Sequence, residues 1–208
     1  TIPGAFFIDS WEVETMNLWS ITFAEDFQDS FGYDIRIFMD SIYEPGYEGY
    51  LYDYMSLVSE KVLQFYTDFD SMANANGRLS RGQVSGAPCD LIAGYAIMDI
   101  PEGESMLFEP EFSAIPASAA FISGAPLVSA ESFTCLYGWP RDHRGEEQLA
   151  DIKLVADALM ANGVNHIIWH GKAHQHAGLD TSRFYATTYV GPTSLFNDQL
   201  LSFNQYLE

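Results

Sequence analysis

The residues in this sequence best suited to catalysis are ionisable side chains associated with short apolar runs. Such runs occupy residues 5–8, 97–100, 126–130 and 166–170. The ionisable residues in or just after them are Asp9, Glu12, Asp99, Glu102, Glu104, Glu131 and His170. In a parallel α/β fold the carboxyl ends of the strands line the active site, so we expect these side chains to meet on one face.

Carboxylates gathered in one partly desolvated cleft predict acid–base chemistry. They repel one another, so that the pKa of one rises while that of another stays low. Cleavage of a glycosidic bond uses such a pair. One carboxylic acid protonates the departing oxygen, and one carboxylate activates water or attacks directly. The pattern therefore favours a glycoside hydrolase.

The acidic positions differ in how strongly they indicate function. Glu131 directly follows an apolar run and precedes Ser-Phe-Thr, which is untypical of a solvated surface position. Glu12 could instead cap a helix that begins near Asn17. Glu102 and Glu104 lie in a predicted turn at residues 101–104, where exposed glutamates are common. Glu131 is the strongest catalytic candidate of the set.

Histidine and tryptophan side chains beside these positions predict contacts with substrate. His170, His174 and His176 are spaced by four and then two residues, without the glutamate of an HExxH metal motif. We expect them to hydrogen-bond sugar hydroxyls or carboxylates, as we expect of Asp9 and Asp99. Trp11 could stack on a sugar ring, although most aromatic side chains simply pack.

Other chemistries lack their motifs. The sequence contains no GxSxG elbow of a serine hydrolase and no GxGxxG or GxxxxGK[ST] phosphate loop. A carbohydrate-binding module without turnover remains an alternative, because aromatic rings and carboxylates also bind sugars that they do not cleave.

Helical patterns separate the apolar runs. Amphipathic or alanine-rich stretches at residues 19–31, 54–72, 117–122, 149–159 and 194–207 predict helices. The first four are followed by glycines at or near the positions where helices would end, namely Gly32, Gly77, Gly124 and Gly163. A weakly alternating run at residues 79–84 predicts one further strand.

Strands that alternate with helices predict βαβ units and a parallel sheet. A complete (β/α)8 TIM barrel typically needs ~250 residues, and this chain has 208 residues with about five predicted strands. We therefore expect one domain, residues 1–208, that forms the last five βα units of such a barrel. The rival interpretation is an open doubly wound sheet.

The charge of the chain limits its partners. It has 29 acidic and 9 basic residues, a net charge of -20. Such a surface repels nucleic acid and anionic membranes, and no apolar run approaches the ~20 residues of a spanning helix. A neutral or cationic ligand, or a bound cation, fits better. Cys89 and Cys135 could be thiols or one disulfide.

The motifs, in their order and spacing, resemble the catalytic barrel of the α-L-rhamnosidases of glycoside hydrolase family 106. The resemblance extends over residues 5–176. It rests on the segments IDSWE (8–12), GYDI (32–35), DIPEGE (99–104), SAESFT (129–134) and His170 with AHQ (173–175). SAESFT is the most specific of these segments.

The resemblance implies a large secreted or periplasmic enzyme that depends on calcium and inverts configuration at a terminal α-L-rhamnosyl linkage of a glycan. The other barrel strands would belong to a longer parent chain. Glu131 aligns with a catalytic glutamate, Glu102 or Glu104 with a second, and Glu12 with a third active-site glutamate. His170 and His174 match a segment beside the sugar.

The loop after the last strand departs from the family pattern. Gly171-Lys172 and the segment 176–178 stand where the family has aromatic and proline residues. This departure leaves open a related deoxy sugar, another glycosidase specificity or a degenerate barrel.

Overall fold

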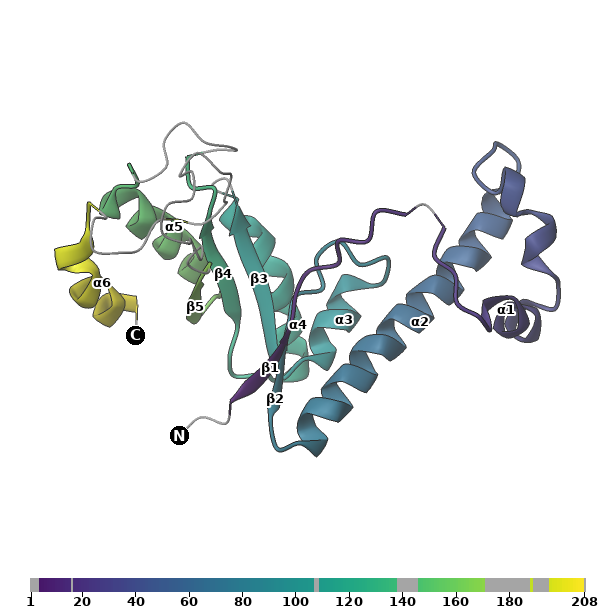
Figure 1. Ribbon diagram of the computed structural model, residues 1–208, viewed down its shortest axis with the longest axis horizontal. Helices are drawn as coiled ribbons and strands as arrows, with labels where there is room; N and C mark the ends of the chain where they lie inside the picture. Colours follow the sequence, from purple (N-terminus) through teal and green to yellow (C-terminus); the bar gives the residue numbers. More distant parts are fainter. Residues whose placement is uncertain are drawn as a thin grey trace, which may run out of the picture.

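The computed structural model describes residues 4–15, 17–106, 109–137, 146–170, 188 and 195–207. In these residues five strands form one sheet in the order β1-β2-β3-β4-β5, and every neighbouring pair is parallel (Figure 1). The strands are β1 (Ala5–Ile8), β2 (Leu79–Gly82), β3 (Ile100–Met106), β4 (Ser129–Thr134) and β5 (His166–Trp169).

The order of the strands in the sheet decides between the two predicted architectures. It follows the order along the chain, so that every helical connection carries the chain one strand further in the same direction. A doubly wound sheet reverses this direction at a switch point. The strands form a curled half-barrel, which confirms the predicted α/β fold of the (β/α)8 type.

Six α-helices and four short 3-10 helices accompany the described strands. The α-helices are α1 (Phe23–Phe31), α2 (Glu48–Ala75), α3 (Leu91–Ile97), α4 (Ala114–Ser123), α5 (Leu149–Ala161) and α6 (Leu200–Leu207). The 3-10 helices are η1 (Ile35–Ile37), η2 (Met39–Ser41), η3 (Pro110–Ser113) and η4 (Asn197–Gln199). The helices predicted from apolar stripes are all present, and α2 begins before its predicted start.

Helix ends follow the glycine signals in the sequence. Gly32 and Gly124 have φ angles of 80° and 80°, and their N–H groups donate to carbonyls in the last turns of α1 and α4. A left-handed residue at this place is the usual end of a helix. The unpredicted helix α3 has only 7 residues, and the side chain of Asp90 accepts a hydrogen bond from the N–H of Ala93 at its start.

The predicted strand at residues 97–100 is wrong. Ile97 ends α3, and the strand β3 begins at Ile100 and continues through the Pro-Glu-Gly-Glu segment. Glycine and proline in that segment resemble a turn. In the fold they allow close packing, because a Cβ on Gly103 would lie 2.8 Å from Ser113 Oγ. The strand β4 likewise lies later than predicted, so Glu131 is inside it.

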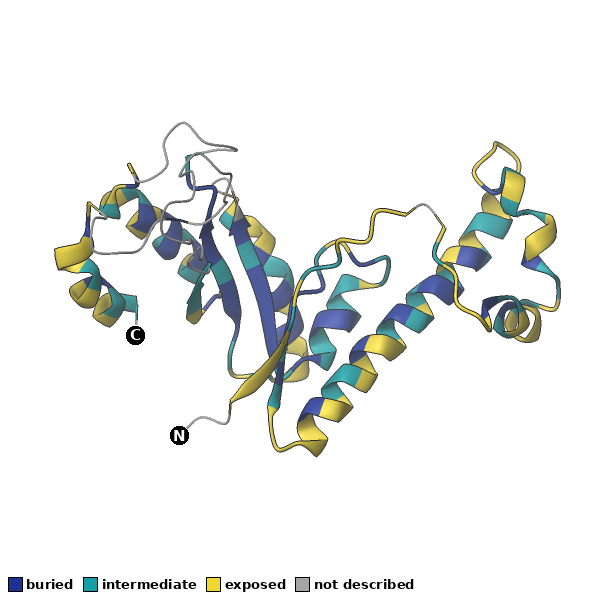
Figure 2. Cartoon of the chain, viewed as in Figure 1, coloured by how far each residue is buried: buried dark blue, intermediate teal, exposed yellow. Residues whose placement is uncertain are grey.

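Two hydrophobic clusters support the sheet. The first joins α1, α2 and α3 and includes the fully buried Phe27. The second packs α5 and α6 against β4 and includes the fully buried Leu159. Figure 2 shows that β3 and β4 are largely buried, whereas β1 at the edge is exposed. The two central strands therefore form the most enclosed part of the sheet.

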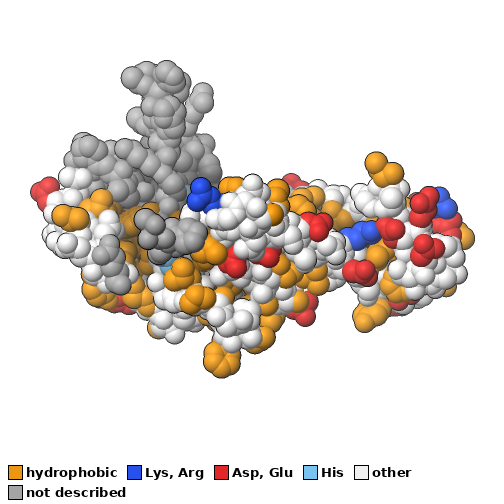
Figure 3. Space-filling view, turned by 90° about the horizontal axis from the view of Figure 1, so that it is seen from below, with side chains coloured by type: hydrophobic (Ala, Val, Ile, Leu, Met, Phe, Trp, Pro, Cys, Tyr) orange, Lys and Arg blue, Asp and Glu red, His pale blue; other side chains and the backbone are white. Residues whose placement is uncertain are grey.

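The long helix α2 extends beyond the sheet and carries α1 at its far end (Figure 1). Asp and Glu side chains gather at this end of the molecule (Figure 3), and Glu25 and Asp26 occupy the first turn of α1. None of the described helices is both long and apolar enough to cross a membrane.

Both cysteines are free thiols, which settles the choice that the sequence left open. Cys135 is buried and Cys89 is half-buried. Burial raises the pKa of the Cys89 thiol to about 11, so the thiol form dominates at neutral pH.

Candidate active site

The register of the sheet places three glutamates on one face of its two central strands. Glu104 on β3 is the register partner of Glu131 on β4, and Glu102 is the partner of Ser129. Register partners on parallel strands point to the same face, ~4.8 Å apart at the backbone. The helix α4 packs on the opposite face, against Gly103. The glutamates therefore point into the half-barrel.

Glu102 is fully buried, and both of its carboxylate oxygens contact protein groups. Oε2 accepts a hydrogen bond from Ser129 Oγ at 2.5 Å. The same oxygen lies 3.0 Å from Arg81 Nε, as an ion pair without hydrogen-bond geometry. Oε1 accepts from Gln83 Nε2 at 3.3 Å. Burial raises the pKa of Glu102, although Ser129, Arg81 and Gln83 each oppose the rise. This geometry favours a supporting role for Glu102.

Glu131 is held from two sides and remains partly exposed. Its Oε2 accepts a hydrogen bond from Gln83 Nε2 at 2.9 Å, and its Oε1 lies 3.1 Å from His170 Nδ1. The same nitrogen lies 2.6 Å from Thr134 Oγ1. With 18% of its side chain exposed, the carboxylate can reach a bound molecule while its orientation is fixed.

Glu104 interacts with three other carboxylates, whereas Glu102 on the same strand interacts with one. Burial raises the pKa of Glu104, and the negative charges of Glu131, Asp9 and Glu12 raise it further, in that order. Asp9 and Glu12 follow β1 and are exposed, and Ser10 Oγ donates to Glu12 Oε1 at 3.3 Å. A carboxyl group in such surroundings holds its proton to higher pH and can act as an acid.

Two residues beside this site have strained backbone conformations. Phe133 and Cys135 have φ angles of 71° and 48°, a region that bulky side chains rarely occupy, and each such residue costs about 1–3 kcal/mol. Two hydrogen bonds hold Phe133, from its N–H to Ser105 Oγ and from Thr188 Oγ1 to its carbonyl. Such strain is concentrated at functional sites in proteins.

The structure does not bring all predicted site residues together. Asp99 precedes β3, where it accepts hydrogen bonds from the N–H and Oγ of Ser80, at the end of the sheet opposite to Glu104. Its predicted place at the carboxyl end of a strand is therefore wrong. Trp11 packs against the first hydrophobic cluster and lines a groove with Leu18 and Val58. His174 lies outside the described residues.

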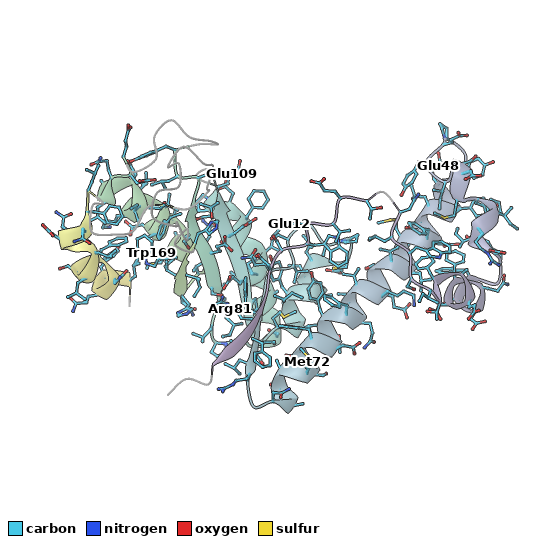
Figure 4. All side chains as sticks on the ribbon, in the orientation of Figure 1. Glu12, Glu48, Met72, Arg81, Glu109 and Trp169 are labelled. Atoms are coloured by element: carbon cyan, nitrogen blue, oxygen red, sulfur yellow. The ribbon has the colours of Figure 1, made fainter. Side chains whose placement is uncertain are left out.

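Sequence reasoning missed the residues that hold the glutamates. Gln83 and Arg81 lie at the end of β2, and Ser129 and Thr134 lie on β4. Figure 4 shows Arg81 and Glu12 in the same central part of the molecule. The signal for Gln83 is positional, because it follows β2 directly, as Asp9 follows β1 and His170 follows β5. A search restricted to ionisable residues passes over an amide.

The described residues do not present a ready calcium site. Calcium needs six to eight oxygen ligands at ~2.3–2.6 Å. In the part of the chain that the structure describes, no group of three or more His, Cys, Asp or Glu side chains is placed to hold a metal ion. Calcium dependence stays a prediction of the resemblance, and no step proposed below depends on a metal.

Comparisons with known proteins also indicate a family of glycoside hydrolases. Residues 4–183 match the family model of glycoside hydrolase family 106, described as alpha-L-rhamnosidase. A Formosa agariphila protein provisionally named a beta-glucuronidase is 27% identical over 183 residues, which cover 81% of this chain and 15% of that protein. A rhamnosidase structure from Novosphingobium sp. PP1Y has a TM-score of 0.63 and 22% identity, over 79% of this chain and 17% of that one. The last likeness concerns the fold alone, and the chain spans less than a fifth of either relative.

Proposed function

Because this chain belongs to the α-L-rhamnosidase family, glycoside hydrolase family 106, we propose that the protein containing it is a glycosidase that cleaves terminal α-L-rhamnosyl linkages. The observation that carries the proposal is the register pairing of Glu104 with Glu131 on the inner face of the half-barrel. The two carboxyl groups differ in their surroundings, which is the requirement for an acid and a base on one site.

The two glutamates have separate roles in the proposed reaction. Glu104, whose pKa is raised by burial and by neighbouring carboxylates, gives its proton to the glycosidic oxygen as the bond from that oxygen to the anomeric carbon breaks. Glu131, oriented by Gln83 and His170, takes a proton from a water molecule, whose oxygen bonds to the anomeric carbon. Attack from the face opposite to the departing group inverts the configuration.

The distance between the two carboxyl groups is the most demanding condition of this mechanism. An inverting enzyme needs ~6.5–9.5 Å between them, whereas the backbones of neighbouring strands are ~4.8 Å apart. Glu12 approaches from the loop after β1, three strands away from Glu131. Glu12 is therefore the alternative acid, and the comparison of variants at Glu104 and Glu12 decides between them.

A neutral sugar suits the described site better than a uronic acid. The relative named a beta-glucuronidase raises the second possibility, which would bring one more carboxylate among Glu104, Glu131 and their neighbours. Arg81 is the cation that the described residues place among these glutamates, and it is already paired with the buried Glu102. A 6-deoxy sugar such as rhamnose carries no charge and avoids this repulsion.

Replacement of Glu131 tests the proposal in the full-length protein. We expect Glu131→Gln to lower kcat for an aryl α-L-rhamnoside by about 10²–10⁴-fold, because the base is lost while the shape is kept. Glu60→Gln, on the exposed side of α2, is the matched control and should leave kcat unchanged.

The product of the parent enzyme gives a second readout of the same proposal. Proton NMR during turnover should show the β-anomer of rhamnose first. Full activity in Glu131→Gln, or cleavage of an aryl β-glucuronide in place of the rhamnoside, contradicts the proposal.

A further inference from the structure

Gln83 lies between two glutamates, yet it transfers no proton in the proposed reaction. Its side chain is fully buried at the end of β2. Nε2 lies 2.9 Å from Glu131 Oε2 on β4 and 3.3 Å from Glu102 Oε1 on β3. One amide group therefore joins three consecutive strands.

The two carboxylates determine the orientation of this amide. Ionised carboxylates only accept hydrogen bonds, so the nitrogen must face them and the oxygen must face away. Gln83 Oε1 is buried and accepts no hydrogen bond from the described residues. A buried acceptor without a hydrogen bond destabilises the folded state. The amide is kept in this orientation despite that cost, which indicates that the two hydrogen bonds it donates are the function of the side chain.

The support beneath Gln83 is an ion pair. Arg81 lies two residues earlier on the same face of β2, 3.0 Å from Glu102 Oε2 and with its guanidinium carbon 4.4 Å from the ring centre of Phe7. Contacts thus continue from β1 through Arg81, Glu102 and Gln83 to Glu131. Every member of this series before Glu131 is half-buried or buried, except for the edge residue Phe7.

Several charges face Glu131 from the neighbouring elements. Glu102 and Glu104 lie beside it on β3, and His170 lies beside it at the end of β5, while Asp9 and Glu12 after β1 act on its neighbour Glu104. Arg81 is the cation below them. The negative charge of Glu131 helps to raise the pKa of Glu102. Without the amide between them, these two carboxylates would face each other without a shared donor.

We propose that Gln83 is a positioning residue that fixes the orientation of the Glu131 carboxylate and separates it from Glu102, with the Arg81–Glu102 ion pair as its rigid support. The positioning itself is a property of the fold. Its consequence for turnover rests on the function proposed above, so the two are tested by separate measurements.

The first measurement is the thermal unfolding of Gln83→Met and its parent as a function of pH, both as full-length protein. Methionine keeps the volume and removes the donor. Near pH 7 both carboxylates are then left without their shared donor, and we expect the unfolding temperature to fall by about 2–4 °C. Near pH 4 Glu102, whose pKa is raised by burial, takes up a proton and can itself donate to Glu131, so the difference should shrink.

The matched control is Gln64→Met, because Gln64 Nε2 also donates to a carboxylate, that of Asp68, but on the exposed side of α2. This variant should unfold within about 1 °C of the parent at both pH values, since exposed pairs contribute little. A difference between Gln83→Met and the parent that is the same at both pH values indicates packing alone and overturns the proposal.

The second measurement is the pH profile of kcat for an aryl α-L-rhamnoside. We expect Gln83→Met to lower kcat by about 10–100-fold, because a small misplacement of a reacting group can slow catalysis by about 10²-fold. KM should change little, and the pH profile of the variant should differ from that of the parent, because the hydrogen bond that Gln83 donates to Glu131 is lost.

If the parent is active and Gln83→Met changes neither its kcat nor its pH profile, the positioning role of Gln83 is overturned. A parent that cleaves no rhamnoside contradicts the proposed function, and the unfolding measurement still decides whether Gln83 holds the two carboxylates.

Discussion

Glu104 shows how the surroundings of one residue support its proposed chemistry. Burial and three neighbouring carboxylates raise its pKa above the ordinary value of 4.5. The proposed acid must carry its proton, so we expect activity to fall as the pH rises through this pKa and the basic limb of the pH profile to lie above 4.5. Glu102 shares the strand and the raised pKa, but its oxygens contact Arg81, Ser129 and Gln83.

Replacing Glu104 with glutamine tests its role as the acid. We expect Glu104→Gln to slow the hydrolysis of substrates with poor leaving groups by about 10²–10⁴-fold. Dinitrophenyl glycosides should be affected much less, because that leaving group departs without a proton. The basic limb of the pH profile should disappear.

Glu60→Gln, at an exposed position of α2, is again the control and should behave as the parent. An effect that is equal for good and poor leaving groups contradicts the acid role of Glu104. The same leaving-group pattern in Glu12→Gln would then assign the acid to Glu12.

At the scale of the element, β3 depends on a glycine for its place in the sheet. A Cβ on Gly103 would meet Ser113 Oγ at 2.8 Å, Pro116 Cγ at 3.1 Å and Ser113 Cα at 3.2 Å. One of these contacts is with backbone, which cannot rotate away. The glycine thus lets η3 and α4 pack on the outer face while Glu102 and Glu104 point inward.

Gly103→Ala should therefore be destabilising. We expect a loss of about 1–3 kcal/mol in the free energy of unfolding, measured with urea, because the added methyl group overpacks the contact. Gly49→Ala is the control, since a Cβ at Gly49 in the first turn of α2 meets nothing within 4 Å. It should leave stability unchanged or raise it by up to about 1 kcal/mol. Equal effects of the two substitutions would contradict this account of β3.

At the scale of the whole molecule, the net charge of -20 opposes folding. The acidic side chains gathered around α1 and the start of α2 lie at one end of the molecule (Figure 3). Salt shortens the range of their repulsion, from ~30 Å at 0.01 M to ~10 Å at 0.1 M. The native state concentrates these charges more than the unfolded chain does.

We expect the unfolding temperature to rise by about 2–4 °C between 10 mM and 150 mM NaCl, which corresponds to about 1 kcal/mol. The measurement is made in EDTA, so that binding of a divalent cation does not contribute. KCl of the same ionic strength should give the same rise. A fall with salt would show that attractive ion pairs, such as Lys61 with Asp26, outweigh the repulsion.

The prediction of the fold from sequence succeeded where a local signal is sufficient. The stripe of α1 and the glycine at its end are short-range features, and they predicted that helix. The prediction for residues 100–106 failed. The proline and glycine in this segment locally prefer a turn, and its glutamates are typical of surface positions. Pairing with β2 and β4, together with packing against η3 and α4, makes that segment a strand.

The sequence by itself determined the alternation of helices and strands, the parallel sheet, and Glu131 as a residue at a strand of the site, since these depend on periodicity and on neighbours in the chain. The tertiary structure decided which glutamate is enclosed and which faces outward. It also revealed Gln83, whose side chain donates hydrogen bonds to Glu102 and Glu131. Glu131 lies 48 residues after Gln83 in the chain. The physical reason is that burial, shared donors and mutual repulsion arise between strands that are distant in sequence, and no local pattern records them.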